Sequence, residues 1–369
     1  MTKDSQDGFA PVFTLTPATV RTLMRIEAAR QQIATLPITP RMLARLRETA
    51  RLFSTHYSTM IEGNRLTQEQ VAEVIVSDQH FPGRERDQGE VKGYYAALDE
   101  VERLAAAGNG MTEAAVRKLH ALVMGAGKAR VKPTPYRDGQ NVIRDSRSNT
   151  IVYLPPEAHD VPPLMTQLMA WLNEEAELPI PVKAAIAHYQ YATIHPYYDG
   201  NGRTARLLTS LVLYLGGYDL KGLYALEEYY ARNLGEYYEA LSIGTSHNYY
   251  QGRAKADITR WISYFIDGMA DSFEKVREQA SREATTGKKD LSAQLRNLDA
   301  RQRKVLSLFE KSREVTAKEI GALFGYQPRN ASKLCAQWTA AHFLEVADAA
   351  KKSRRYRLAE PYEALVTNR

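Results

Sequence analysis

The chain has 369 residues with a net charge of +6, and 44% of them are hydrophobic, which is enough for two or three domains with well-filled cores. Ordinary amounts of glycine (22) and proline (16) exclude a collagen-like or wholly disordered protein, and no run of about 18 apolar residues suggests a membrane-spanning helix. A single cysteine, Cys335, excludes an internal disulfide and a cysteine-based zinc site, and no signal-peptide pattern opens the chain, so we expect a soluble, cytoplasmic protein.

The body of the chain is predicted to be helical almost throughout, because apolar residues recur at three- and four-residue spacing. Thr67 followed by Gln70 is a typical helix N-cap pair, and the glycines at 216–217 form a typical helix stop. The predicted helices cover residues 17–34, 39–53, 67–76, 89–106, a segment from about 112, and residues 162–174, 182–194, 204–215, 227–243 and 256–283. A polar linker follows.

Residues 58–64, Ser-Thr-Met-Ile-Glu-Gly-Asn, combine a helical spacing with a helix stop. Ser58 and Glu62 are four residues apart and therefore share one face of a helix that ends at Gly63. A carboxylate near the C-terminal end of a helix opposes the helix dipole, which is unfavourable unless another group holds it. The alternative from this pattern alone is an ordinary exposed glutamate.

Residues 133–156 depart from the helical pattern. β-Forming residues at 141–143 and 150–153 flank a polar turn at 145–149, which predicts a β-hairpin. Because an isolated hairpin is only marginally stable, we expect it to lie against the helical body. It is either a connector between helices or a functional flap.

The most informative stretch is residues 195–206, His-Pro-Tyr-Tyr-Asp-Gly-Asn-Gly-Arg-Thr-Ala-Arg. Proline and the Gly-Asn-Gly triplet cannot continue a helix, so His195 closes one helix and Thr204 lies early in the next. A glycine-rich loop that opens a helix presents free backbone N–H groups at the positive end of the helix dipole. This arrangement predicts an anion-binding site.

The side chains of the same stretch suit phosphate chemistry. Arg203 and Arg206 extend the anion site outward. Asp199 is an oxygen ligand suited to Mg²⁺ shared with phosphates, and His195 suits a general base at neutral pH. Each residue alone is a weak signal, whereas the fixed order of all of them is a strong one.

This stretch resembles the signature of the Fic family, His-Pro-Phe-x-Asp/Glu-Gly-Asn-Gly-Arg-x-x-Arg, with Tyr197 in place of phenylalanine as the one departure. Because that position packs in the family's core, the Tyr197 hydroxyl needs a buried partner. Similar flanking residues extend the resemblance over roughly residues 13–273. The resemblance implies a mainly α-helical Fic core with a hairpin flap, and transfer of AMP from ATP to a Ser, Thr or Tyr hydroxyl of a target protein or of the chain itself.

The resemblance also implies a role for each site residue. His195 is the catalytic base, and Asp199 holds Mg²⁺ against the α- and β-phosphates. The remaining assignments are the phosphate cradle (Gly200, Asn201 and Gly202, with the Asn201 side chain assisting), the diphosphate ligand Arg203, the γ-phosphate ligand Arg206, the adenine neighbours (Tyr229, Asn233 and Tyr237) and the target-docking flap residues (Val142, Ile143 and Val152).

Residues 58–63 likewise resemble the Fic inhibitory motif, Ser/Thr-x-x-x-Glu-Gly/Asn. By this resemblance Ser58 and Glu62 are inhibitory, and Glu62 pairs with Arg206 in the space that the γ-phosphate needs. We expect an autoinhibited enzyme that Glu62→Gly releases. In some relatives such a glutamate orients a water for the removal of AMP, and this alternative stays open.

The C-terminal part changes to short elements and a basic balance. Residues 301–369 carry 14 Lys and Arg against 7 Asp and Glu, whereas the preceding 300 residues carry 35 against 36. Helices are predicted at 301–310, 316–325 and 328–339, and strands at 343–346 and 355–358 around a basic turn at 351–354. The second helix has Thr316 as its N-cap with Glu319 three residues later, and Gly325 closes it.

This order of elements resembles a winged helix, with Arg329, Asn330 and Lys333 at the start of the recognition helix. DNA is therefore a possible partner, and protein docking or a homodimer is the alternative. We divide the chain into an N-terminal helical region with the inhibitory helix (1–110), a Fic catalytic core (111–284), a linker (285–297) and a winged helix (298–369). A DNA-binding regulator is the second functional hypothesis, and UMP is an alternative to AMP as the transferred group.

Overall fold

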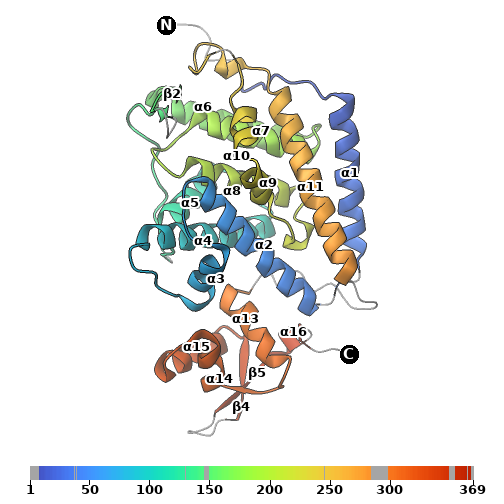
Figure 1. The fold of residues 1–369 in the computed structure, drawn as a ribbon, viewed down its shortest axis with the longest axis vertical. Coiled ribbons are helices and arrows are strands. Elements are labelled where there is room, and N and C mark those ends of the chain that lie inside the picture. Colours follow the sequence, from blue (N-terminus) through green and yellow to red (C-terminus); the bar gives the residue numbers. More distant parts are fainter. Residues whose placement is uncertain are drawn as a thin grey trace.

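The computed structural model describes residues 8–36, 38, 40–128, 130–144, 149–244, 246–283, 298–348, 354–363 and 365–366. Within these ranges the fold is mainly helical with two small sheets, as the sequence predicted (Figure 1). In this part of the chain, no helix is long and apolar enough to cross a membrane. The predicted linker, residues 285–297, lies outside the described residues.

The helical body runs from α1 to α11. Its helices are α1 (Pro17–Thr35), α2 (Pro40–Ile61), α3 (Gln68–Ser77), α4 (Glu85–Ala107), α5 (Glu113–Met124), α6 (Val161–Glu174), α7 (Ile180–Ile194), α8 (Asn201–Leu215), α9 (Leu226–Arg232), α10 (Leu234–Leu241) and α11 (Thr259–Glu283), with the short 3₁₀ helices η1 (Ala158–Asp160), η2 (Leu220–Gly222) and η3 (Arg253–Lys255) between them. Capping residues explain several boundaries. Thr67 and Gln70 form the predicted capping box of α3, and Thr112 caps α5.

The predicted hairpin is present. Strands β1 (Ile143–Arg144) and β2 (Ile151–Tyr153) pair antiparallel, with Ile143 opposite Tyr153. The hairpin is tied to the body because the Tyr153 hydroxyl donates to the carbonyl of Thr193 in α7 (2.7 Å). Of the predicted turn, residues 145–148 lie outside the described residues.

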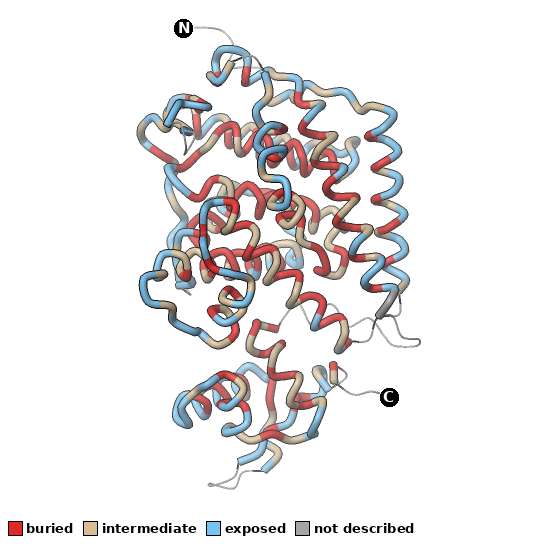
Figure 2. The backbone as a smooth tube through the Cα atoms, in the orientation of Figure 1, coloured by how far each residue is buried: buried red, intermediate tan, exposed pale blue. Residues whose placement is uncertain are grey.

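Helices α7 and α8 form the centre of the core (Figures 1 and 2). Most of α7 is buried on every side, including the polar His188, and α8 buries eleven of its residues. Around them pack α4, α5, α6 and α11, while α1 lies along α11 at the side of the body. The loop between α7 and α8, which contains residues 195–200, therefore starts and ends on rigid elements.

The largest differences from the predicted helices concern residues 39–53 and 227–243. Helix α2 runs unbroken to Ile61, because neither glycine nor proline interrupts the chain between residue 53, where the apolar pattern ended, and Gly63. The helix predicted over residues 227–243 is two helices, α9 and α10, because Asn233 adopts a non-helical conformation (φ −136°, ψ 62°).

The C-terminal region contains the predicted helices and strands and two short elements more, a strand and a helix. Its elements are α13 (Ala300–Phe309), β3 (Val315–Thr316), α14 (Ala317–Phe324), α15 (Pro328–Ala340), β4 (Leu344–Asp348), β5 (Arg355–Leu358) and α16 (Glu360–Glu363), with the sheet order β3-β5-β4. The predicted Thr316–Glu319 capping box and the left-handed Gly325 (φ 66°) bound α14. The sequence analysis missed β3, since two residues carry no alternation signal. Residues 351–353 of the predicted basic turn lie outside the described residues.

Helix α13 attaches this region to the body next to α2 and α3 (Figure 1). Its Arg303 is buried and donates through Nε to Glu48 Oε2 of α2 (3.2 Å) and through Nη2 to the Tyr95 hydroxyl of α4 (3.3 Å). A buried, multiply bonded arginine is a specific contact, so the C-terminal region rests on the first half of α2.

Candidate active site

His195 lies directly after α7 in a left-handed backbone conformation (φ 52°). Its N–H donates to the carbonyl of Tyr191 (3.0 Å), and its own carbonyl accepts from Arg137 Nε (3.0 Å). The ring Nδ1 lies 3.4 Å from the carbonyl oxygen of Ala192. When Nδ1 carries the proton toward this carbonyl, Nε2 keeps the lone pair that a general base needs.

The environment of His195 keeps its imidazole neutral. Burial lowers the pKa of His195 to about 4, more than the neighbouring Ala192 carbonyl and the Glu62 carboxylate raise it. At neutral pH the ring is therefore a proton acceptor.

The loop before α8 is shaped by Gly200 and Asn201. Gly200 has φ 76°, a conformation that favours glycine. The Asn201 side chain accepts from the N–H of Tyr197 (3.0 Å) and donates to the carbonyl of Tyr197 (2.7 Å). The sequence analysis assigned this side chain to the phosphates, whereas in the structure both of its polar atoms bind the backbone of the loop.

The start of α8 has the character of an anion site. The helix begins at Asn201 without a side-chain cap, so its first N–H groups lack partners within the helix. At Gly202 an added Cβ would collide with Glu62 Oε1, so only glycine lets a carboxylate approach the backbone this closely. One anion, the Glu62 carboxylate, thus already lies close to this end of α8.

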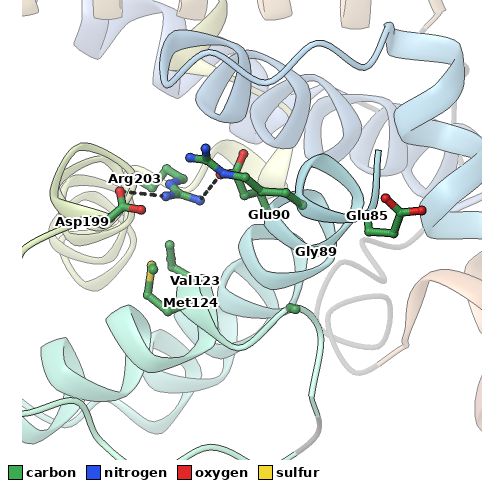
Figure 3. A pocket seen from close by; sticks show the side chains of 9 residues that line it. Glu85, Gly89, Glu90, Val123, Met124, Asp199 and Arg203 are labelled. Atoms are coloured by element: carbon green, nitrogen blue, oxygen red, sulfur yellow. Dashed lines mark hydrogen bonds and ion pairs between the residues drawn. The ribbon is translucent and has the colours of Figure 1, made fainter. Parts of the chain in front are cut away.

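A pocket of about 220 Å³ adjoins the loop and is lined by parts of α4, α5 and α8 (Figure 3). Asp199, with a side chain 57% exposed, and the buried Arg203 face into it, and Arg203 Nη2 donates to Asp199 Oδ1 (3.3 Å). On the opposite side of Arg203, Glu90 Oε1 lies 3.7 Å from Nη1. The sequence analysis did not find Glu90, because it belongs to a different helix far along the chain.

Metal binding rests on one carboxylate. No group of three or more His, Cys, Asp or Glu in the described part of the chain is arranged to hold a metal ion. The exposed Asp199 at a pocket next to an anion site nevertheless fits Mg²⁺, which is commonly held by one or two carboxylates together with substrate phosphates and water.

Arg206 connects α8 to the end of α2. Its guanidinium is buried and donates to Ser58 Oγ (2.7 Å), to the Ser58 carbonyl (2.8 Å) and to Glu62 Oε1 (2.8 Å). Burial is the largest influence on the pKa of Arg206 and lowers it, but the Glu62 carboxylate, Tyr237 and Tyr94 together raise the pKa above its ordinary value, so the arginine stays charged. The structure thus brings together Ser58, Glu62 and Arg206, as the resemblance implied.

The flap lies beside the catalytic loop. Arg137, just before the hairpin, donates to the carbonyls of Gly139 (2.9 Å) and Pro156, and its N–H donates to the Pro196 carbonyl (3.0 Å). Of the flap residues, Val152 is exposed, whereas Val142 and Ile143 are half-buried. Arg137 therefore joins the two ends of the flap to His195, a role with no local signal in the sequence.

The three residues assigned to adenine do not lie on one surface. Tyr237 is 2% exposed and bonds His188 Nε2 (3.0 Å), and Tyr229 packs against Gly268 and Tyr264 of α11. Asn233 is exposed at the break between α9 and α10. The buried position of Tyr237 suits packing behind Arg206 rather than stacking on a base.

A stacked aromatic pair, His120 and Tyr197, supports the loop between α7 and α8. His120 of α5 stacks on Tyr197 (centroids 3.5 Å apart, 12° between planes), and its Nε2 lies 2.9 Å from the Asp199 carbonyl. The Tyr197 hydroxyl is buried and makes no hydrogen bond with the described residues, so the expected partner is missing there. The ring of Tyr197, and not its hydroxyl, therefore makes the contacts that hold this residue in place.

Comparisons with known proteins cover this region of the chain. Residues 110–213 match the family described as Fic/DOC family. The protein adenylyltransferase fic-1 of Caenorhabditis elegans is 32% identical over 202 residues, which are 52% of this chain and 38% of that protein. The protein adenylyltransferase Fic of Aedes aegypti is 30% identical over 198 residues, 53% of this chain and 38% of that protein. The chain thus spans less than half the length of these curated relatives.

Solved structures share the fold. A Fic family protein from Desulfovibrio desulfuricans G20 matches with a TM-score of 0.60 and 23% identity over 95% of this chain and 99% of that chain. Fic-1 from Caenorhabditis elegans matches with a TM-score of 0.58 and 24% identity over 72% of this chain and 74% of that chain.

Proposed function

From the match of residues 110–213 to the Fic/DOC family and the similarity to protein adenylyltransferases, we propose that this chain is a protein adenylyltransferase, which moves AMP from ATP to a Ser, Thr or Tyr hydroxyl of a target protein or of itself. The observation that carries the proposal is the position of a neutral His195 beside an anion-binding helix start, with Arg203 and Arg206 on the same helix. We expect the protein to act in the cytoplasm.

In the proposed reaction, His195 Nε2 accepts the proton of the target hydroxyl. The target oxygen forms a bond to the α-phosphorus, and the bond from the α-phosphorus to the bridging oxygen of the β-phosphate breaks, so that diphosphate leaves. The N–H groups of Asn201 and Gly202 hold phosphate oxygens, joined by that of Gly200 if it leaves Asp199 Oδ1, to which it donates in this structure (2.6 Å). Arg203 stabilises the charge that develops on the diphosphate. Mg²⁺ held by Asp199 would supply further charge neutralisation.

The flap would position the target. An extended target segment that pairs with the hairpin gains main-chain hydrogen bonds whatever its side chains are, and the exposed Val152 adds apolar contact. Because Arg137 ties both ends of the flap to the loop of His195, a segment bound there is held at a fixed distance from the base.

Glu62 is proposed to restrain this activity. The Glu62 carboxylate occupies the position beside the Arg206 guanidinium that a γ-phosphate would take. ATP must therefore displace Glu62 or bind with its phosphates shifted. With Glu62 removed, Arg206 is available to the nucleotide. In the reverse direction, the same carboxylate would orient a water for the removal of AMP.

The test uses two variants and two labels. Glu62→Gly incubated with Mg²⁺ and α-labelled ATP is expected to label itself or proteins of a lysate. Glu62→Gly/His195→Ala is expected to give no label with α-labelled ATP, and Glu62→Gly is expected to give none with γ-labelled ATP. Competition by excess unlabelled UTP tests UMP as the transferred group. Label that persists without His195, or label from γ-labelled ATP, would contradict the proposal.

A second proposed function concerns the C-terminal region, which has the element order of a winged helix. Arg329, Asn330 and Lys333 are exposed at the start of α15, where side chains of a recognition helix contact DNA. A mobility shift at low salt that disappears in Arg329→Ala/Lys333→Ala would support DNA binding. No shift, together with a dimer in sedimentation, would instead favour the homodimer.

A further inference from the structure

Glu90 is a half-buried carboxylate at the active site to which the proposed reaction gives no task. It lies in the second turn of α4, its side chain is 11% exposed, and it faces the pocket that Asp199 and Arg203 line (Figure 3). A carboxylate at a pocket that would receive phosphates repels them, so its presence needs a compensating reason.

The contacts of Glu90 supply that reason. Oε1 accepts from Arg86 Nε (3.0 Å) and lies 3.7 Å from Arg203 Nη1, while Oε2 accepts from Asn64 Nδ2 (3.0 Å). Its charge is therefore balanced by two guanidinium groups. Among the described residues, Asp199 and Glu90 are the carboxylates that pair with Arg203.

Arg203 needs both carboxylates, Asp199 and Glu90, to balance its charge. Its side chain is 2% exposed, and its Nε and Nη1 make no hydrogen bond with the described residues. A buried guanidinium without a nearby carboxylate is costly. Asp199, however, is also the residue that fits a cation, and a carboxylate shared with a cation pairs less strongly with an arginine. When Asp199 binds a cation, Glu90 is placed to balance the charge of Arg203 and to keep its guanidinium oriented.

We propose that Glu90 is a positioning residue that holds Arg203 toward the diphosphate part of the nucleotide and so leaves Asp199 available for its own ligand. This inference rests on the proposed function, because it takes Arg203 as the diphosphate ligand. Without the charge of Glu90, the remaining partner of Arg203 is Asp199, and the guanidinium turns toward it.

Glu90→Gln separates this role from a structural one. Glutamine keeps the shape of the side chain and an oxygen that accepts from Asn64, but it loses the charge facing Arg203. Glu85→Gln is the matched control, because Glu85 lines the same pocket but is 64% exposed and points away from Arg203 (Figure 3).

The experiment measures AMP and ADP binding by calorimetry in EDTA, with Glu62→Gly as the parent so that Glu62 does not compete. We expect Glu90→Gln to weaken ADP binding about fivefold and to leave AMP binding unchanged, because AMP lacks the phosphate that Arg203 would hold; Glu85→Gln changes neither. With Mg²⁺ and ATP, Glu90→Gln is expected to lower kcat more than it raises KM.

Each other outcome decides against the inference. Unchanged or tighter ADP binding means that Glu90 does not support Arg203, and equal weakening of AMP and ADP means a structural role only. The same effect from Glu85→Gln means that only the total charge of the pocket matters. A parent that binds no ADP at all would overturn the proposed function itself, which distinguishes that failure from the failure of the inference.

Discussion

Helix α2 carries two groups of ion pairs, one in its first half and one at its C-terminal end, and the two differ in burial and in the number of charges they share. In the first half, Arg47 and Arg51 share Glu102 (2.9 and 2.7 Å), with all three side chains 1–7% exposed. At the other end, Glu62 is 27% exposed and makes a single ion pair, with Arg206. The first group suits a permanent attachment of α2 to its neighbours, whereas the Glu62–Arg206 pair suits release of Glu62 from Arg206.

The first group, which we name the anchor cluster (Arg47, Arg51, Asp99, Glu102 and Arg303), joins α2, α4 and α13. Its members lie within helices, so they cannot separate without moving a helix. Glu62 follows the last residue of α2 and precedes Gly63 (φ 91°), so a local backbone change can move it while α2 stays in place. The same helix therefore combines a fixed end with a releasable end.

The largest expected effect tests the fixed end. Glu102→Gln leaves two buried guanidinium groups without their shared carboxylate, and we expect the free energy of unfolding to fall by about 3 kcal/mol. Denaturant unfolding measures it. The control is Glu345→Gln, which removes an exposed pair with Arg357 and is expected to change the value by about 0.5 kcal/mol or less. If the two variants lowered the free energy of unfolding equally, the anchor cluster would stabilise the protein no more than a surface ion pair does, which would contradict the account.

The second effect concerns the releasable end without touching Glu62. Ser58→Ala removes one charge-assisted hydrogen bond to Arg206 Nε, a contact that holds the arginine beside Glu62. We expect a rate of AMP transfer about fivefold above wild type, equivalent to roughly 1 kcal/mol, because the bond contributes about that much to the restrained arrangement. A rate at or below that of wild type would show that Ser58 does not hold the restrained state.

A third variant probes the loop between the two helices of the site. Tyr197→Phe removes a buried hydroxyl without a hydrogen bond among the described residues, while the ring still stacks on His120. The free energy of unfolding is expected to rise by up to about 1 kcal/mol with an unchanged transfer rate, as measured by denaturant unfolding and labelling. A loss of stability would mean that the hydroxyl has a partner.

The smallest expected effect is that of pH on the released enzyme. Since burial lowers the pKa of His195 to about 4, the imidazole stays unprotonated as the pH falls from 8 to 6 and loses its basicity only near pH 4. In Glu62→Gly, kcat is therefore expected to change less than about twofold between pH 6 and 8, whereas a histidine with the ordinary pKa of about 6.5 would lose roughly three quarters of its neutral form at pH 6. A fourfold fall at pH 6 would contradict the buried, neutral base.

Local signals in the sequence predicted much of this structure. Capping pairs such as Thr67–Gln70 and Thr316–Glu319 act within one turn, and the structure confirms both. The pairing of Glu62 with Arg206 spans 144 residues, yet two short motifs implied it through the family resemblance.

Other parts depend on contacts that leave no local pattern. Arg303 meets Glu48 across 255 positions, and His120 meets the Asp199 carbonyl across 79. Burial of Tyr237 was equally unreadable, because a chain with 22 tyrosines does not distinguish core rings from ligand-stacking ones. Such features follow from the packing of α2, α5, α8 and α13, which exists only once the chain has folded.

The most direct test of the account is to measure the AMP-transfer rate and the free energy of unfolding of wild type and Glu62→Gly on the same preparations. If Glu62 restrains the site locally while the anchor cluster holds α2, the rate rises about 50-fold, equivalent to about 2.3 kcal/mol, and the free energy of unfolding changes by less than about 1 kcal/mol. Equal rates, or a rate increase that comes with a large loss of stability, would contradict it.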